Sequence, residues 1–301
     1  MKIKKPSKNE WLDIIGNCPD ATFFATPDWI NIVERTTDYK NATRLIILDD
    51  GTKAIFPLMV IGKNLKIFSQ YLSVPFYNYG GIFSQRPLSK DEVEQIIKKI
   101  KSGLPLRKIH IFSNPLSKNC FEKKFYELEY FTQILDLSMG FDHFKDRYQE
   151  RDQVRKIRKA RKLGVRIVCD KRDNYIEDYY KMYIDTVRRW GQADDIKKIS
   201  FFRMLAESSY VKFWFAQKED KNIAAIILVY FGQFVLFHSG AFFYKWQKER
   251  PNNLIHYEAI KDACRNKYKY YDFLPSGNLQ GVEKFKETFG SKKMMFNLYK
   301  Y

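Results

Sequence analysis

The sequence runs twice through the same order of predicted elements, which strongly limits its fold. Each half contains an apolar hairpin rich in β-branched and aromatic residues, a loop, an amphipathic helix and a strand. The first copy comprises the hairpin and loop 53–83, the helix 89–103 and the strand 108–112; the second comprises the hairpin 222–243, the helix 249–267 and the strand 268–274. The residue identities differ but the order and approximate lengths agree. We therefore predict two copies of one α/β unit, with mixed, mostly antiparallel sheets flanked by helices.

Local signals define the ends of both repeated helices. Ser89 with Glu92 three residues later forms a capping-box pattern, and Gly103 is expected to end that helix. Asn252 or Asn253 is the expected cap of the second helix. Four residues of this second helix are spaced by three or four positions and are predicted to share its core face: Leu254, Tyr257, Ile260 and Cys264.

Further helices are predicted before each hairpin, so each copy should be one complete lobe. They cover 26–36, where Thr26 caps and Pro27 opens the first turn, and 174–190 and 197–209 in the second half. We accordingly place an N-terminal lobe at 1–143 and a C-terminal lobe at 144–301.

The junction between the lobes is strongly basic. Residues 144–163 are predicted to form one amphipathic helix ended by Gly164, with a strand at 165–168. Cationic side chains recur on one side of it: Arg151, Arg155, Arg158 and Lys162. This basic face is either a solvated helix surface or a surface that contacts phosphates.

Composition narrows the class of protein. Of 301 residues, 45% are apolar and 29% charged, which indicates a folded globular chain, and the 17% aromatic content suggests sheet-rich cores or ring-lined clefts. The net charge of +18 favours nucleic acid, anionic lipid head groups or phosphate-bearing substrates as partners, unless it only solvates the surface. The N-terminus has no signal-peptide pattern, and the longest apolar run, at 223–243, is interrupted by Gly232 and Gln233, so we expect a buried hairpin and no transmembrane segment.

Several kinds of chemistry are disfavoured. The four cysteines lie far apart without a C-x-x-C pair, so no metal site or disulfide framework is expected and a reducing cytoplasm fits. The sequence has no H-x-x-x-H, G-x-S-x-G or Walker pattern, which argues against metal-dependent hydrolysis, a nucleophile elbow and a P-loop. His110 and His238 lie within apolar strands and are expected to be core histidines.

Two places in the second copy can carry chemistry. The start of the helix at "RPNN" offers free backbone N–H groups beside Arg250, an arrangement suited to an anion, although an ordinary capped helix looks the same. Asp272 ends an aromatic strand, where it is a structural cap for the next loop, a base, or a group that orients an amine. Lys286 follows the glycine-containing loop and can fold back to stabilise charge on a carbonyl oxygen.

At these residues the sequence resembles the Fem-type (FemABX-like) aminoacyl and peptidyl transferases and the related acyltransferases of the GNAT superfamily. The resemblance follows the family's order over most of the chain, and the aspartate, glycine loop and F-K-x-x-F-G pattern at its end is the most specific part. The segments that carry it are "FFATPDWI", "YNYGGIF", "RKIRKARKLGVRIV", "PNNLIHYEAIKDA" and "YYDFLPSGNLQGVEKFKETFG".

The resemblance implies two tandem GNAT-like lobes and an amide-forming acyl transfer. Lys286 would stabilise the carbonyl oxygen and Phe285 would shape the channel. Arg250, Asn252 and Asn253 would lie on the donor side. The aromatic loop with Tyr77, Tyr79, Gly80 and Gly81 would lie on the acceptor side.

The chain departs from the family in two ways. No long coiled-coil arm is predicted, and "RPNN" replaces the Q/R-x-x-G-x-G/A loop of enzymes that use acetyl-coenzyme A. The donor is therefore left open between aminoacyl-tRNA and acyl-CoA, bound as a co-substrate with no permanent cofactor.

Two kinds of function follow. The first hypothesis is a cytoplasmic transferase that acylates an amine of a cell-wall (peptidoglycan) or other glycan precursor, without a metal. The alternatives are a non-catalytic nucleic-acid-binding protein that uses the basic face and exposed aromatic residues, and an inactive member of the family. The sequence leaves the oligomeric state open.

Overall fold

The computed structural model describes residues 1–61, 70–76, 78–103, 108–117, 121, 129–150, 153–170, 175–191, 196–277 and 279–301. The chain forms two compact units, one of residues Met1–Phe131 with Met294–Tyr301 and one of residues Thr132–Lys293. It enters the second unit within strand β9 (Glu129–Asp136) and returns to the first within strand β15 (Lys292–Lys300). The boundary expected from the sequence, between 143 and 144, lies inside the helix α4 (Gly140–Glu150) of the second unit.

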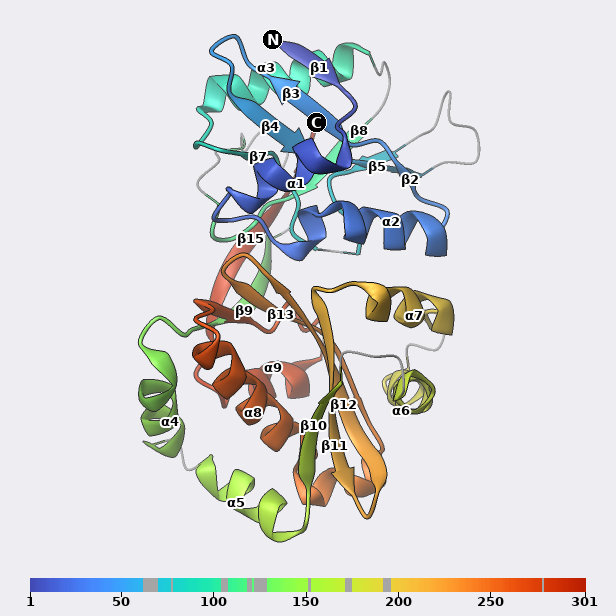
Figure 1. Cartoon of the computed structure of the whole chain (residues 1–301), viewed down its shortest axis with the longest axis vertical. Helices are drawn as coiled ribbons and strands as arrows, with labels where there is room; N and C mark the ends of the chain where they lie inside the picture. The colour runs from blue at the N-terminus through green and yellow to red at the C-terminus, as the bar shows by residue number, and fades with distance from the viewer. Residues whose placement is uncertain are drawn as a thin grey trace. The chain divides into compact units, whose positions relative to one another are not determined.

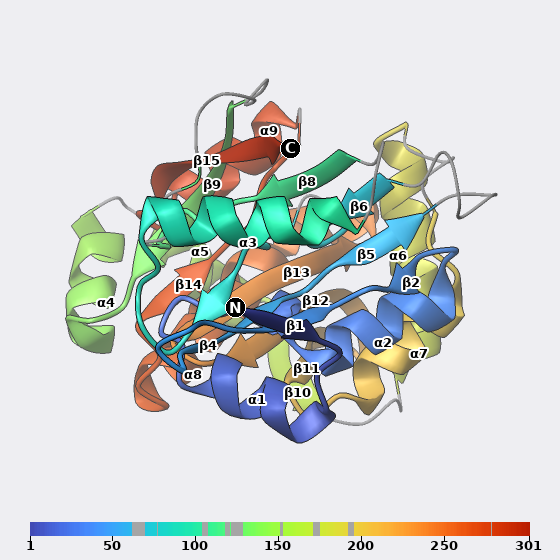
Figure 2. The ribbon, with the colours of Figure 1, turned by 90° about the horizontal axis from the view of Figure 1, so that it is seen from above.

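The first unit places helices on both faces of short strands. Its elements are β1 (Lys2–Lys4), α1 (Lys8–Gly16), the 3-10 turn η1 (Phe23–Ala25), α2 (Pro27–Thr36), β2 (Lys40–Asn41), β3 (Arg44–Ile47), β4 (Lys53–Phe56), β5 (Met59–Ile61), β6 (Gln70–Leu72), β7 (Phe83–Ser84), α3 (Lys90–Ser102) and β8 (Lys108–Phe112). Strands β1, β3, β4 and β7 pair in that order, antiparallel throughout. Figures 1 and 2 show α1 and α3 on opposite sides of β3 and β4.

A second group of strands in the first unit follows the expected hairpin. β5 pairs antiparallel with β6, β6 pairs parallel with β8, and the end of β15 pairs antiparallel with β8. The predicted turn at 62–64 lies outside the described residues. The apolar face of α3 packs on these strands through Val93, Ile96 and Ile100. The capping box is confirmed, because Ser89 Oγ accepts from the Glu92 N–H and the Glu92 side chain accepts from the Ser89 N–H.

The second unit has one strongly twisted sheet with helices on both faces. Its further elements are α5 (Val154–Lys162), β10 (Arg166–Asp170), α6 (Ile176–Arg189), α7 (Ile199–Glu207), β11 (Val211–Lys218), β12 (Lys221–Phe231), β13 (Phe234–Phe242), the 3-10 helix η5 (Tyr244–Glu249), α8 (Pro251–Arg265), β14 (Tyr270–Asp272) and α9 (Gln280–Glu287). The strand order is β10-β11-β12-β13-β14-β9, antiparallel except for the parallel pair β13 and β14. In Figure 1, α8 lies on one side of β11 and β12, and α6 and α7 lie on the other.

The long apolar run is the predicted hairpin. β12 and β13 turn at Gly232, which has a φ of +54°, and the paired strands bury Ile226, Leu228 and Val235 in the core. In the described part of the chain, no helix is long and apolar enough to cross a membrane. The expected fold is confirmed: two mixed α/β units with mostly antiparallel strands and flanking helices, whose longest described helix is α8 with 15 residues.

Two helix predictions need correction. The single helix expected over 144–163 is two helices, α4 and α5. Tyr148 and Ile157 are buried in the same core, whereas on one continuous helix residues nine positions apart would point in opposite directions. The cap of α8 is also different from the prediction. Arg250, in the left-handed conformation with φ of +56°, takes the N-cap position, so Asn252 and Asn253 lie within the first turn.

Candidate functional site

A cavity of about 790 Å³ lies inside the second unit, where the two parallel strands separate. The pairing of β13 with β14 covers only three residue pairs and ends at Leu236 and Asp272. Beyond these residues, Phe237–Gly240 on one strand and Phe273–Ser276 on the other line the cavity. Parallel strands that part in this way leave a wedge between them, which side chains or a ligand can fill. Helices α6, α8 and α9 close the wedge.

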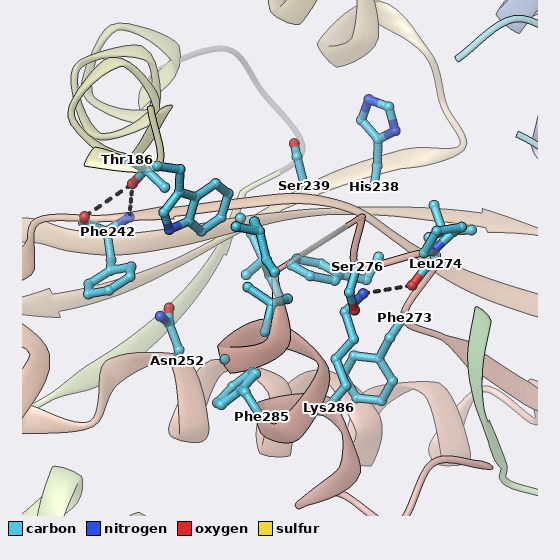
Figure 3. A pocket seen from close by; sticks show the side chains of 18 of the residues that line it. Thr186, His238, Ser239, Phe242, Asn252, Phe273, Leu274, Ser276, Phe285 and Lys286 are labelled. Carbon is cyan, nitrogen blue, oxygen red and sulfur yellow. Dashed lines mark hydrogen bonds between the residues drawn. The ribbon is translucent and has the colours of Figure 1, made fainter. Parts of the chain in front are cut away.

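Lys286 contributes a buried amino group to this cavity, and it is the only lysine among the described residues that line it. Its side chain is 2% exposed, and Figure 3 shows it pointing from α9 toward Leu274 and Ser276. Nζ donates a 2.6 Å hydrogen bond to the Leu274 carbonyl oxygen. Burial lowers the pKa of Lys286 from 10.5 to about 8, while the carboxylates of Asp272 and Glu283 oppose that change. At neutral pH the amine is therefore still mostly protonated, with two further N–H donors beyond the one used by Leu274.

Asp272 has a structural position behind the cavity. Its carboxylate is fully buried, accepts a 2.5 Å hydrogen bond from Thr132 Oγ1 and a 2.8 Å bond from the Leu274 N–H, and is not part of the cavity lining. Leu274 has a φ of +56°, so this bond holds a backbone conformation that an L-residue rarely adopts. The geometry therefore matches the capping alternative for Asp272, with an added electrostatic effect on Lys286.

His256 lines the same cavity from α8. The ring is 1% exposed, lies edge-on to Phe237 at a centroid distance of 4.7 Å, and also contacts Phe285 at 5.6 Å. Its Nδ1 is 2.8 Å from the Tyr271 hydroxyl. Burial and the nearby Lys286 charge lower the pKa of His256 to about 3, so the imidazole is neutral at physiological pH.

The two histidines expected in the core are only partly buried. His238 lines the cavity from β13, where its strand has already separated from β14. His110 lies on β8 of the first unit, with its Nδ1 2.6 Å from Gln70 Nε2. Both strands are apolar, but the order of apolar and polar residues along a strand does not show where the neighbouring strand ends. The sequence therefore could not distinguish a core position from a position in a cavity wall.

The predicted donor-side residues separate into two groups. Asn252 and Phe285 line the cavity with Lys286 (Figure 3). Arg250 is exposed at the start of α8 and Asn253 is buried, and neither lines the cavity. Pro251 at the first helical position has no N–H, so the start of α8 provides one fewer backbone donor than an ordinary helix.

The predicted acceptor-side residues lie in the first unit, whereas all residues that line the cavity belong to the second. Tyr77 lies outside the described residues. Tyr79 is buried with its ring edge-on to Phe296, and Gly80 pairs with Ser113 in a parallel bridge. Gly81 has a φ of +132°, which requires glycine. These positions therefore have local structural roles of their own.

The basic face is exposed where the structure describes it. Arg155, Arg158 and Lys162 are exposed on α5, opposite the buried Ile157 and Ala160, whereas Arg151 lies outside the described residues. The neighbouring Arg161 forms a 2.5 Å ion pair with Glu258 of α8. The cationic surface is thus fixed to the helix that also contributes His256 to the cavity.

The wall formed by α6 was not predicted as part of a site. Four residues on or next to this helix line the cavity: Tyr183, Thr186, Val187 and Trp190. Thr186 Oγ1 accepts from the Phe242 N–H at 3.1 Å and donates to the Phe242 carbonyl at 3.2 Å, which fixes α6 against β13 (Figure 3). Their helical spacing predicts a core face, and no sequence signal separates residues that pack on the core from residues that line a cavity. Among the described residues, no three His, Cys, Asp or Glu side chains are grouped as metal ligands.

Residues 147–287 match the family model described as Acetyltransferase (GNAT) domain. This match covers most of the second unit, so that part of the chain is similar to GNAT acetyltransferase domains.

The whole chain shares its fold with solved tandem proteins. FemX aligns over 99% of this chain and 97% of its own, with a TM-score of 0.71 and 13% identity. The C-terminal domain (DUF2156) of a putative lysylphosphatidylglycerol synthetase from Agrobacterium fabrum aligns over 96% and 89%, with a TM-score of 0.62 and 11% identity. A tandem GNAT protein from the clavulanic acid biosynthesis pathway aligns over 100% and 98%, with a TM-score of 0.58 and 8% identity. No curated protein matches the sequence. The fold is thus that of tandem GNAT proteins.

Proposed function

We propose that this protein is an acyltransferase that joins an activated acyl group to an amine, with the reaction centred on Lys286. The observation that carries the proposal is the buried ammonium group at the point where β13 and β14 separate. Placing a charge there lowers the stability of the fold, and such a cost is typical of functional sites. A cavity of about 790 Å³ next to it can hold an acyl group and part of its carrier.

The proposed reaction needs one positively charged hydrogen-bond donor beside the carbonyl oxygen of the acyl group. The amine nitrogen attacks the acyl carbonyl carbon, and the carbonyl oxygen becomes an oxyanion that the Lys286 ammonium stabilises. Collapse of this intermediate forms the amide and breaks the thioester or ester bond, whose electron pair leaves with the carrier. The proton lost by the amine balances the charge of the leaving group. The Leu274 carbonyl holds Nζ in place without consuming its other two N–H donors.

The acyl donor that we propose first is an aminoacyl-tRNA, and acyl-CoA is the second choice. The exposed Arg155, Arg158 and Lys162 on α5 and the net charge of +18 suit a polyanionic carrier. The acceptor proposed is an amine of a peptidoglycan or other glycan precursor. A likeness in fold to FemX and to a lysylphosphatidylglycerol synthetase domain is compatible with this choice.

A second candidate function, nucleic-acid binding without catalysis, rests on the same exposed cations of α5. It predicts tight RNA binding that weakens steeply with salt, and no acyl product.

The test uses the whole protein with a panel of aminoacyl-tRNAs and acyl-CoAs and a soluble peptidoglycan precursor, and detects the amide product by mass spectrometry. Lys286→Met is expected to reduce turnover about 10²–10³-fold, because it removes an oxyanion donor. Lys284→Met is the matched control, since Lys284 is an exposed lysine of the same helix. Equal turnover by both variants would reject Lys286 as the reaction centre. Salt-sensitive RNA binding without product from any donor would favour the second function.

A further inference from the structure

We infer that His256 is a second oxyanion donor of this site, presenting a protonated Nε2 to the cavity beside Lys286, with Tyr271 as the residue that positions it. This inference rests on the proposed function for its chemistry, while the geometry of the histidine stands on its own. Neither residue was singled out by the sequence pattern, because a histidine on the core face of an amphipathic helix looks like ordinary packing.

The first step concerns the direction of the hydrogen bond between the two side chains. Tyr271 is fully buried, and its hydroxyl has one hydrogen-bond partner in the described chain, His256 Nδ1 at 2.8 Å. If Nδ1 carried the proton, the hydroxyl hydrogen of Tyr271 would be buried without an acceptor, which is unfavourable. The hydroxyl therefore donates to Nδ1. Burial raises the pKa of Tyr271 well above 10, so this hydrogen is retained.

The second step fixes the proton on the other nitrogen. A neutral imidazole carries one N–H, so a ring whose Nδ1 accepts must be protonated on Nε2. Burial and the adjacent Lys286 charge keep the ring neutral, with a pKa of about 3. His256 is thus locked as a neutral donor, and the ring cannot serve as a base through Nε2.

The third step locates Nε2 at the cavity. The ring lines the cavity, and within the described residues its single hydrogen bond is the one to Tyr271. Nδ1 is occupied by the Tyr271 hydroxyl, and the two nitrogens of one ring point in different directions. Nε2 is therefore the ring nitrogen left to face the cavity that the ring lines. Phe237, Phe273 and Phe285 surround the ring and hold this orientation.

The chemistry that this pair recognises is a carbonyl oxygen that gains negative charge. Lys286 and His256 line the same cavity. In the proposed arrangement the Lys286 ammonium and the Nε2–H of His256 share one carbonyl oxygen. Two such donors stabilise the intermediate more than the planar substrate, since only the intermediate carries full charge there.

The tautomer is tested without any substrate. Long-range ¹H–¹⁵N spectra of the whole protein labelled in histidine, with the His256 signals assigned by their loss in His256→Gln, report which ring nitrogen is protonated. We expect a protonated Nε2 and an acceptor Nδ1 that do not change between pH 5 and pH 8. A protonated Nδ1, or a ring that titrates in this range, would overturn the inference and leave the proposed function of Lys286 standing.

The catalytic role is tested with three variants in the assay for the amide product. His256→Gln, whose amide N–H lies near the position of Nε2, is expected to lose less than about 10-fold in turnover. His256→Phe, which keeps a ring but no donor, is expected to lose about 10²-fold, and Tyr271→Phe about 10-fold with a KM within about 2-fold of wild type. Equal losses for the glutamine and phenylalanine variants would show that His256 acts by packing alone.

Discussion

Replacing Lys286 by methionine should separate stability from activity. The pKa of the lysine is about 8 instead of 10.5, and each pH unit corresponds to about 1.36 kcal/mol, so burial of the charge costs about 3 kcal/mol near neutral pH. Methionine removes this cost and keeps an unbranched side chain of similar length. The substitution also removes the hydrogen bond to the Leu274 carbonyl oxygen, and the loss of this bond costs about 1–3 kcal/mol because the acceptor is buried. The free energy of unfolding of the variant should therefore lie between the wild-type value and a value about 2 kcal/mol higher.

The dependence on pH has a definite sign. Below pH 8 the lysine is protonated in both the folded and the unfolded protein, so the full cost of burial is present. Between pH 8 and about 10.5 the unfolded chain binds more protons than the folded one, and the stability of the wild type should rise with pH. Lys286→Met lacks this contribution, so its advantage over wild type should shrink across that window.

Urea unfolding followed by tryptophan fluorescence at pH 7 and pH 10 measures both quantities, and Lys284→Met controls for the loss of one exposed positive charge. A Lys286→Met protein that is less stable than wild type at pH 7 would refute the reasoning, because the lysine would then stabilise the fold. So would a stability difference that is the same at both pH values. The expected pair of results, unchanged or higher stability with turnover reduced about 10²–10³-fold, identifies a residue kept for its chemistry.

Three further outcomes are expected. The turnover of wild type should fall as pH rises through about 8, where Lys286 loses its proton, and a profile that is flat to pH 9 would contradict an ammonium donor. Gly80→Ala should destabilise the first unit by about 1–3 kcal/mol in urea unfolding, since the added Cβ would lie 2.0 Å from Ser73 Oγ. Gly51→Ala is the control, because its Cβ would have no atom within 4 Å and the variant tests only the strain of a positive φ. Charge removal from α5 should weaken tRNA binding, and the slope of log affinity against log salt should become shallower by about 1 for each phosphate that the protein no longer neutralises. Filter binding measures this slope with a triple glutamine variant of Arg155, Arg158 and Lys162, and an unchanged slope would place the tRNA elsewhere.

Elements defined by local chemistry could be predicted from the sequence. The hairpin of β12 and β13, the capping box of Ser89 and the core face of α8 all depend on side chains a few residues apart. The sequence also indicated that Lys286 can lie near the end of β14, because only a short loop and the start of α9 separate the two. The same reasoning placed Arg250 and Asn253 at the site, where the structure does not have them, because a sequence does not show which turn of a helix faces a cavity.

Long-range pairing limited the remaining predictions. β15 returns to the first unit and pairs with β8, whereas its sequence alternates like any half-buried strand and does not specify a partner. The break between α4 and α5 depends on two separate packing contacts with one core, those of Tyr148 and Ile157. The wall of the cavity from α6 depends on where β13 and β14 separate, which is a property of the assembled sheet.

The structure explains why an aspartate and a lysine lie around the end of β14. Asp272 accepts the Leu274 N–H and so holds the left-handed turn that directs the Leu274 carbonyl to Lys286 Nζ. Its negative charge also raises the pKa of Lys286 against the effect of burial. This buried carboxylate thus helps to fix the position of the amine and, together with Glu283, favours its protonated form. In the proposed reaction, an aspartate outside the cavity can therefore influence Lys286 without contacting the substrate, because it acts through the backbone of Leu274 and through its electric field.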